Sequence, residues 1–194
     1  MIGQTQNELD VLAFADQNAW AKWLKVNHIS SPGIWLKLAK KDSGAASVSY
    51  AEALEVALCY GWIDGQKKSQ DADYFLQKFT PRRSKSLWSK RNVTKALQLI
   101  ESGRMQAAGV AEVELAREDG RWEAAYDTQR DMVVPEDFLR AVRQSEQAEA
   151  FFATLNKTNL FAIAWRLQTA KTPETRARRF AALLEMLEKG EKLH

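Results

Sequence analysis

Residues 62–80 read WIDGQKKSQDADYFLQKFT, and this stretch decides the fold class. Two short runs within it, Trp62–Ser69 and Tyr74–Thr80, are predicted strands because they carry residues that favour β-structure between polar turn residues. The acidic segment Gln70–Asp73 joins them. The sequence therefore predicts a β-hairpin in the N-terminal half of the chain.

Residues 34–38, upstream of the hairpin, form a further predicted strand because apolar residues recur at every second position. The alternation in residues 34–38 separates Ile34, Leu36 and Leu38 from Trp35 and Lys37. A second strand is expected near this one.

Two helices are predicted around these strands. The first has Asp16 as its N-cap and runs to about Val26. The second begins at Ser49, where Glu52 three residues later completes a capping box, and Gly61 ends it.

From residue 87 onward the apolar residues recur every three or four positions, which is typical of helices. Residues 120–135 are polar and irregular and are a predicted linker. The sequence thus predicts an α+β fold, with a small antiparallel sheet packed by helices in the N-terminal half and an all-helical C-terminal part. The expected domains are an α+β core, 1–120, that carries the motifs, and a helical subdomain, 121–194. The predicted helices cover Leu87–Ser102, Met105–Arg117, Pro135–Arg143, a segment capped by Ser145, Leu160–Ala170, and a segment that opens at Thr172 and Pro173.

The composition excludes several classes of protein. Of the 194 residues, 45% are hydrophobic and 27% are charged, which excludes a wholly disordered or low-complexity chain. No apolar run approaches the roughly 20 residues of a membrane-spanning helix. Residues Met1 to Glu8 lack the pattern of a secretory signal, and Cys59 is the only cysteine, so we expect a cytoplasmic protein without an internal disulfide.

Positive charge is concentrated between Gln66 and Lys95, where nine Lys and Arg residues stand against Asp71 and Asp73. The net charge of the whole chain is only +3, so this excess is local. Such a cluster either steers an anionic partner to the surface or is simply solvated.

The common catalytic signatures are absent from the sequence. It contains no GxSxG, GxxxxGK[ST] or GxGxxG motif, and His28 and His194 have no metal-ligand spacing. Cys59 ends a predicted helix, where the helix dipole raises the pKa of a thiol. We therefore expect no catalytic residue, no metal and no cofactor.

The most motif-like residues suggest a ligand pocket. Arg82 and Arg83 offer forked donors to a carboxylate or phosphate, and Ser86 or Ser89 could cap the next helix, where free N–H groups bind an anion. Asp64 could position an arginine or accept a ligand hydroxyl or amine. In the alternative interpretation the tryptophans belong to the core, and Asp64 pairs with Arg82 or Arg83. The predicted ligand-binding residues are Trp62, Asp64, Arg82, Arg83, Trp88, Ser89 and Asn92.

Three motifs carry a family resemblance: ALCYGWIDGQ (57–66), KFTPRRSKSLWSKRN (78–92) and AKTPETRARRFAALLEML (170–187). With them the sequence resembles the YdeI/OmpD-associated proteins, also named for bacteriocin protection, from about Phe14 to Leu187. The resemblance implies a role in resistance to cationic antimicrobial peptides or bacteriocins, with no established reaction, and a core likened to the YjbR/CyaY type of α+β fold.

The favoured hypothesis is a non-enzymatic binding protein with an anion pocket, with a small anionic ligand and another protein as its candidate partners. A nucleic acid could instead bind the basic stretch 66–95, with Trp88 or Tyr74 stacking on bases, but Asp71 and Asp73 interrupt that stretch, so nucleic acid is the less favoured partner. An enzyme could use Asp64 as acid or base on an anionic substrate. A protein-binding module could use Arg176, Arg178 and Arg179 on the last helix.

Overall fold

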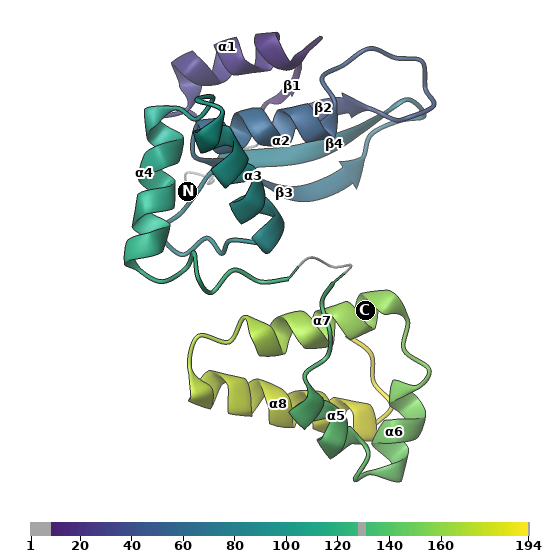
Figure 1. Ribbon diagram of the computed structural model, residues 1–194. Coiled ribbons are helices and arrows are strands. Elements are labelled where there is room, and N and C mark those ends of the chain that lie inside the picture. Colours follow the sequence, from purple (N-terminus) through teal and green to yellow (C-terminus); the bar gives the residue numbers. More distant parts are fainter. Residues whose placement is uncertain (1–8, 128–130, 194) are drawn as a thin grey trace, which may run out of the picture. The chain divides into compact units, whose positions relative to one another are not determined.

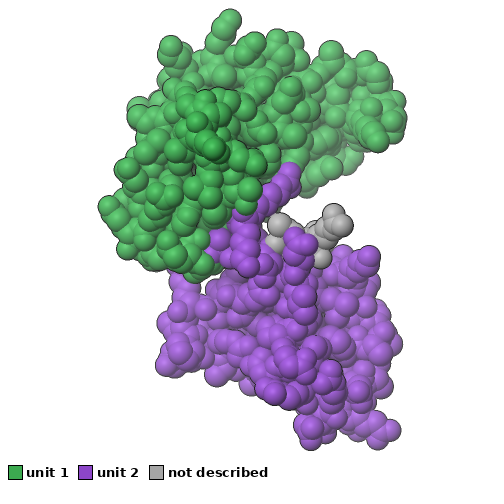
Figure 2. All heavy atoms as spheres, viewed as in Figure 1, with its two compact units in different colours: residues 1–88, 92–124 green, residues 89–91, 125–194 purple. Residues whose placement is uncertain are grey.

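The computed structural model describes residues 9–127 and 131–193, which form two compact units. The N-terminal unit comprises residues 1–88 and 92–124, and the C-terminal unit comprises residues 89–91 and 125–194 (Figure 2). Met1 to Glu8, on which the expectation about export depends, and His194 lie outside the described residues.

The N-terminal unit contains a four-stranded sheet together with helices α1 to α4 (Figure 1). Its strands lie in the order β1-β2-β4-β3, and the predicted hairpin is confirmed as β3 and β4. The sheet is mixed rather than wholly antiparallel, because the three-residue strand β1, which was not predicted at its position, pairs in parallel with β2. The strands are β1 (Val11–Ala13), β2 (Ile34–Ala39), β3 (Trp62–Ser69) and β4 (Tyr74–Pro81).

Helices α1 and α2 are capped as the sequence predicts. The Asp16 side chain accepts a hydrogen bond from the Ala19 N–H, and Ser49 and Glu52 form a complete capping box. The third helix begins at Lys90 rather than Leu87, because Leu87 and Trp88 are irregular and Ser89 forms a β-bridge with Tyr126. The helices of this part of the chain are α1 (Gln17–Asn27), α2 (Tyr50–Cys59), α3 (Lys90–Glu101) and α4 (Ala107–Glu118).

The core of the N-terminal unit lies between the helices and one face of the sheet. Trp20 of α1 is fully buried, and its indole Nε1 donates to the backbone oxygen of Ala53 in α2 over 3.1 Å. Because opposite residues of paired strands share a face, the register places Ile34 and Leu36 of β2 beside Phe79 and Gln77 of β4 on the buried face.

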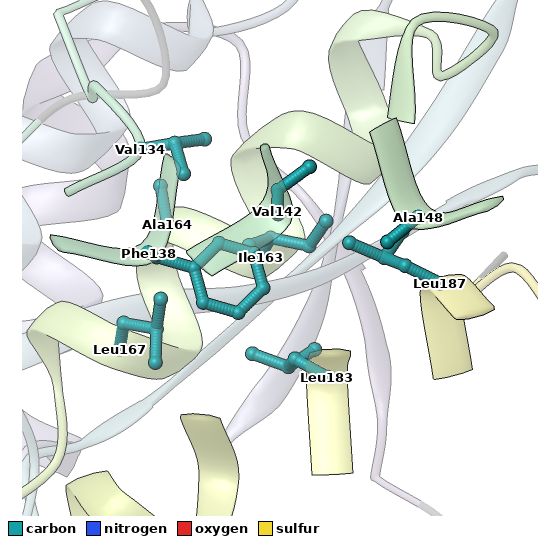
Figure 3. Close-up of a cluster of buried hydrophobic side chains, with 9 residues drawn as sticks. All are labelled: Val134, Phe138, Val142, Ala148, Ile163, Ala164, Leu167, Leu183 and Leu187. Carbon is teal, nitrogen blue, oxygen red and sulfur yellow. The ribbon is translucent and has the colours of Figure 1, made fainter. Parts of the chain in front are cut away.

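The C-terminal unit consists of helices packed around one apolar cluster (Figure 3). The ring of Phe138 is fully buried in this cluster, among Ile163, Leu167 and Leu183. Helix α7 begins at Lys157, earlier than the expected Leu160. Asn156 caps it, because its side chain accepts a hydrogen bond from the Asn159 N–H. The helices are α5 (Glu136–Val142), α6 (Glu146–Phe152), α7 (Lys157–Gln168) and α8 (Pro173–Glu188).

The α+β fold is confirmed. All named strands of the described residues precede Arg82, and an isolated bridge between Ser89 and Tyr126 is the further β-pairing recorded. Within the described ranges, every helix is too short or too polar to cross a membrane.

Candidate functional site

The structure brings two of the predicted pocket residues, Arg82 and Trp88, into direct contact. The guanidinium carbon of Arg82 lies 3.5 Å from the centre of the Trp88 ring, and both side chains are buried. Arg82 Nη1 donates to the Leu87 oxygen over 3.3 Å, and the Arg82 backbone N–H donates to the Gly61 oxygen. Arg82 is therefore part of the interior of the unit.

Arg82 and Trp88 belong to a larger cluster, with Arg121 and Trp122, that the sequence did not indicate. Trp122, assigned to the predicted linker, packs edge-on against Trp88 with ring centres 4.9 Å apart. Arg121 is buried and donates to the Ser86 oxygen and to the Asp119 carboxylate. No local pattern could have predicted this, because Trp88 and Trp122 are 34 residues apart.

Glu112 of α4 faces the same cluster. Burial raises the pKa of its carboxyl, while the positive charges of Arg82 and Arg121 oppose that rise. This half-buried carboxyl group therefore interacts electrostatically with two buried arginines.

The other predicted pocket residues lie in different surroundings. Trp62 is fully buried and donates its indole N–H to the His28 oxygen over 3.1 Å. Asp64 accepts a hydrogen bond of 2.7 Å from the Tyr50 hydroxyl, on the face of the sheet that α2 covers.

The loop after β4 places the remaining pocket residues. Arg83 is exposed, and its backbone N–H donates to Ser86 Oγ over 2.9 Å, so Ser86 closes this turn. Ser89 pairs with Tyr126 in the C-terminal unit, and Asn92 is buried on α3. An anion pocket over these residues stays a prediction.

A different group of aromatic and basic residues lies on the face of the sheet opposite the buried core. We call it the open face. The register puts Trp35 of β2 beside Lys78 of β4 and Val11 of β1 on this face. Val11 is 51% exposed, and Trp35 and Lys78 are partly accessible. The open face also carries Lys37, Lys68 and Tyr74.

A β-bulge in β3 decides which lysine joins the open face. Asp64 pairs with Phe79 but Lys67 pairs with Gln77, so two residues, Gly65 and Gln66, stand opposite Lys78. This extra residue reverses the alternation and places Lys68 rather than Lys67 on the open face. Buried Gln77 donates to the backbone oxygens of both bulge residues, which stabilises the bulge.

The lysines of the open face lie over its rings. Lys68 Nζ is 4.2 Å from the centre of the Trp35 ring, and Lys37 Nζ is 4.0 Å from that of Tyr74. Lys37 also lies 3.9 Å from the Asp71 carboxylate in the hairpin turn. Within residues 9–127 and 131–193, no carboxylate forms an ion pair with Lys68 or Lys78. The open face thus combines accessible aromatic rings with positive charge.

A groove of about 410 Å³ lies between α1, the end of α2 and the start of α4. Tyr60, Arg104 and Gln106 are among the residues lining it, and Arg104 is paired with Glu55 over 2.9 Å. Cys59 also borders the groove, and burial raises the pKa of its thiol to about 11. In the part of the chain that the structure describes, no group of three or more His, Cys, Asp or Glu is placed to hold a metal ion.

Comparison with known families divides the chain much as its two units do. A family model described as a domain of unknown function, DUF8412, matches residues 12–112, a little over half of the chain. The chain belongs to this family. The sheet lies within the matched region except for Val11, the first residue of β1.

The C-terminal part matches a second family model, described as "Bacteriocin-protection, YdeI or OmpD-Associated", over residues 131–190. This confirms the expected family for helices α5 to α8. The other two motifs of the resemblance, 57–66 and 78–92, lie in the region matched by DUF8412. No curated protein and no solved structure matches the chain.

Proposed function

We propose that this protein is a non-enzymatic binding protein whose N-terminal unit takes an anionic ligand on the open face of its sheet, in a role linked to resistance to bacteriocins or cationic antimicrobial peptides. The observation that carries the proposal is the position of Lys37, Lys68 and Lys78 around Trp35 and Tyr74. Ammonium groups attract an anion, and partly accessible rings offer it an apolar surface.

The acidic residues of the hairpin support this placement. Asp71 Oδ1 accepts hydrogen bonds from the backbone N–H groups of Asp73 and Tyr74, at 2.9 and 2.8 Å, so the carboxylate is held in the turn. Lys68 lies in the same cross-strand row as Lys37, on the other side of Leu76, and Lys78 lies one row further from the turn. Asp71 forms its ion pair with Lys37, which leaves the charge of the other two lysines available to a ligand.

The state of the reactive groups favours binding over catalysis. A thiol with a pKa of about 11 is protonated near neutral pH, and the protonated form is a poor nucleophile. Asp64, the candidate acid or base, is hydrogen-bonded to Tyr50 on the covered side of the sheet.

The sign of the charge also limits how the protein could protect a cell. A cationic peptide would be repelled by the lysines of the open face. We therefore place any protective effect downstream of the anionic ligand, and not in capture of the peptide by this surface.

Thermal unfolding with tripolyphosphate tests the proposal, because a ligand that binds only the folded state raises the melting temperature. We expect a rise for the parent protein, its loss in the double variant Lys68→Gln/Lys78→Gln, and its retention in Lys22→Gln/Lys25→Gln, which changes two exposed lysines of α1. A rise that survives Lys68→Gln/Lys78→Gln but disappears in Arg83→Ala would move the site to the predicted pocket in the loop after β4. No rise in the parent would overturn the proposal.

A further inference from the structure

We infer that the anionic ligand of the open face is single-stranded nucleic acid, with a base stacked on Trp35 and the backbone held by Lys37, Lys68 and Lys78. This inference rests on the proposed function, because it names the ligand of the same surface. Nucleic acid was the less favoured partner from the sequence, and the geometry of the sheet changes that assessment.

The first step is the position of Trp35. It lies on β2, which is flanked by β1 and β4, so the ring has a neighbouring strand on each side. The residue paired with Trp35 on β1 is Val11, which is 51% exposed, so the sheet surface is accessible on that side of the ring. A partly accessible ring on the surface of a sheet is a stacking platform for a base.

The second step is the spacing of the lysines. Lys78 lies in the cross-strand row of Trp35, and Lys37 and Lys68 lie in the next row on the same face, on either side of Leu76. Rows on one face are separated by two residues, about 7 Å along the strand. The ammonium groups of Lys68 and Lys78 lie 4.2 and 6.0 Å from the centre of the Trp35 ring, and that of Lys37 lies over Tyr74. The charge is therefore spread over two rings, which suits an extended polyanion better than a compact one.

The third step is the bulge in β3. Without the extra residue, Lys68 would face the covered side, and Lys67 would take the place opposite Leu76 on the open face. The buried side chain of Gln77 holds the bulge through two hydrogen bonds to its carbonyl oxygens. A buried polar residue committed to the bulge shows that the position of Lys68 is built into the fold.

The fourth step distinguishes single strands from duplexes. A base can stack on Trp35 only when it is unpaired and unstacked from its neighbours, so a duplex could use only the lysines. Trp88, the other aromatic residue considered for stacking, is 2% exposed and covered by Arg82, whereas Tyr74 lies on the open face.

Fluorescence anisotropy tests the inference with the full chain and a labelled single strand of about ten nucleotides. The strand should bind more tightly than a duplex of the same sequence. Its affinity should fall roughly 20-fold between about 50 and 200 mM salt, because three phosphates are neutralised.

Variants separate stacking from charge. Trp35→Ala should weaken binding of the single strand about tenfold, while Trp35→Phe keeps most of the affinity because it retains a ring. Lys68→Gln/Lys78→Gln should reduce the slope of log affinity against log salt by about 1.4, and Lys22→Gln/Lys25→Gln should leave it unchanged. Circular dichroism establishes that each variant is folded.

Equal affinity for single strand and duplex in the parent, or unchanged affinity in Trp35→Ala, would overturn the inference. If tripolyphosphate binds through Lys68 and Lys78 but the oligonucleotide does not bind, this inference fails and the proposed function stands. If neither binds, both fail. A folding defect in Trp35→Ala does not remove the test, since the comparison of single strand with duplex uses the parent protein.

Discussion

The guanidinium of Arg82 stacks on the indole of Trp88, 3.5 Å from the ring centre, while its sequence neighbour Arg83 points into solvent. Two adjacent arginines in one motif therefore have different physical roles. The first contributes to the packing of the interior, and the second contributes charge to the surface.

This difference gives a prediction for stability. Arg82→Ala removes a buried stacking partner and leaves a void beside Trp88, so the free energy of unfolding should fall by about 2–4 kcal/mol. Arg83→Ala should change it by less than about 0.5 kcal/mol. Urea denaturation of both variants measures the difference. Similar small losses in the two variants would show that the Arg82 stacking is not important for the fold.

Much of the fold could be predicted because its signals are local. Ser49 and Glu52 are three residues apart, and the Ile34, Leu36, Leu38 alternation is contained within one strand. Strand β1 was missed because three residues are too few to show a period, and its place in the sheet depends on pairing with β2. The start of α7 was placed too late because Asn156, read as an interruption, is a cap.

The open face could be predicted only in part. The alternation in β2 already separated Trp35 and Lys37 from the buried residues. The neighbours of Trp35 on β4 and β3 depend on strand register and on the bulge after Asp64, and both are set by contacts between residues far apart in the sequence. For the same reason, the contact of Trp88 with Trp122 left no sequence signal.

A second prediction concerns the pH dependence of stability through Glu112. Its pKa in the folded protein is raised above the ordinary 4.5, so the folded state holds this proton more tightly than the unfolded chain. Its contribution to the free energy of unfolding therefore falls as the pH rises from the unfolded pKa through the folded one. Glu112→Gln removes this loss.

The stability of Glu112→Gln relative to the parent should therefore improve between about pH 4 and pH 7. Urea denaturation across this range measures the difference, with Glu114→Gln as the control, because Glu114 is exposed on the same helix. Parallel pH profiles for the parent and Glu112→Gln would contradict the prediction.

A third prediction concerns the close approach of α4 to the end of α2 at Gly109. A Cβ atom on this residue would lie 2.5 Å from the Cys59 oxygen and 2.7 Å from the Leu58 oxygen. Gly109→Ala should therefore destabilise the protein by about 1–3 kcal/mol, although the same change in an open helix is favourable by about 1 kcal/mol. Thermal unfolding measures the sign. A more stable variant would mean that the two helices are further apart.

A fourth prediction concerns the core of the C-terminal unit. Leu187 of α8 is fully buried in the apolar cluster, whereas Leu184 is only half-buried against it. Leu187→Ala should reduce the free energy of unfolding by about 2–5 kcal/mol, and Leu184→Ala should cost less, about 1–2 kcal/mol. Because the chain has two compact units, the transition is followed by hydrogen exchange of amides in α5 to α8. Equal losses would indicate that the two positions are equally covered.

The most direct measurement of the central claim is the mapping of tripolyphosphate onto the full chain by NMR chemical shifts. Binding at the open face should perturb the indole N–H of Trp35 and the amides of Lys68 and Lys78, and leave those around Arg83 and Arg104 unchanged. Perturbations confined to Arg83 and its loop, or to the groove at Arg104, with Trp35 unaffected, would contradict it.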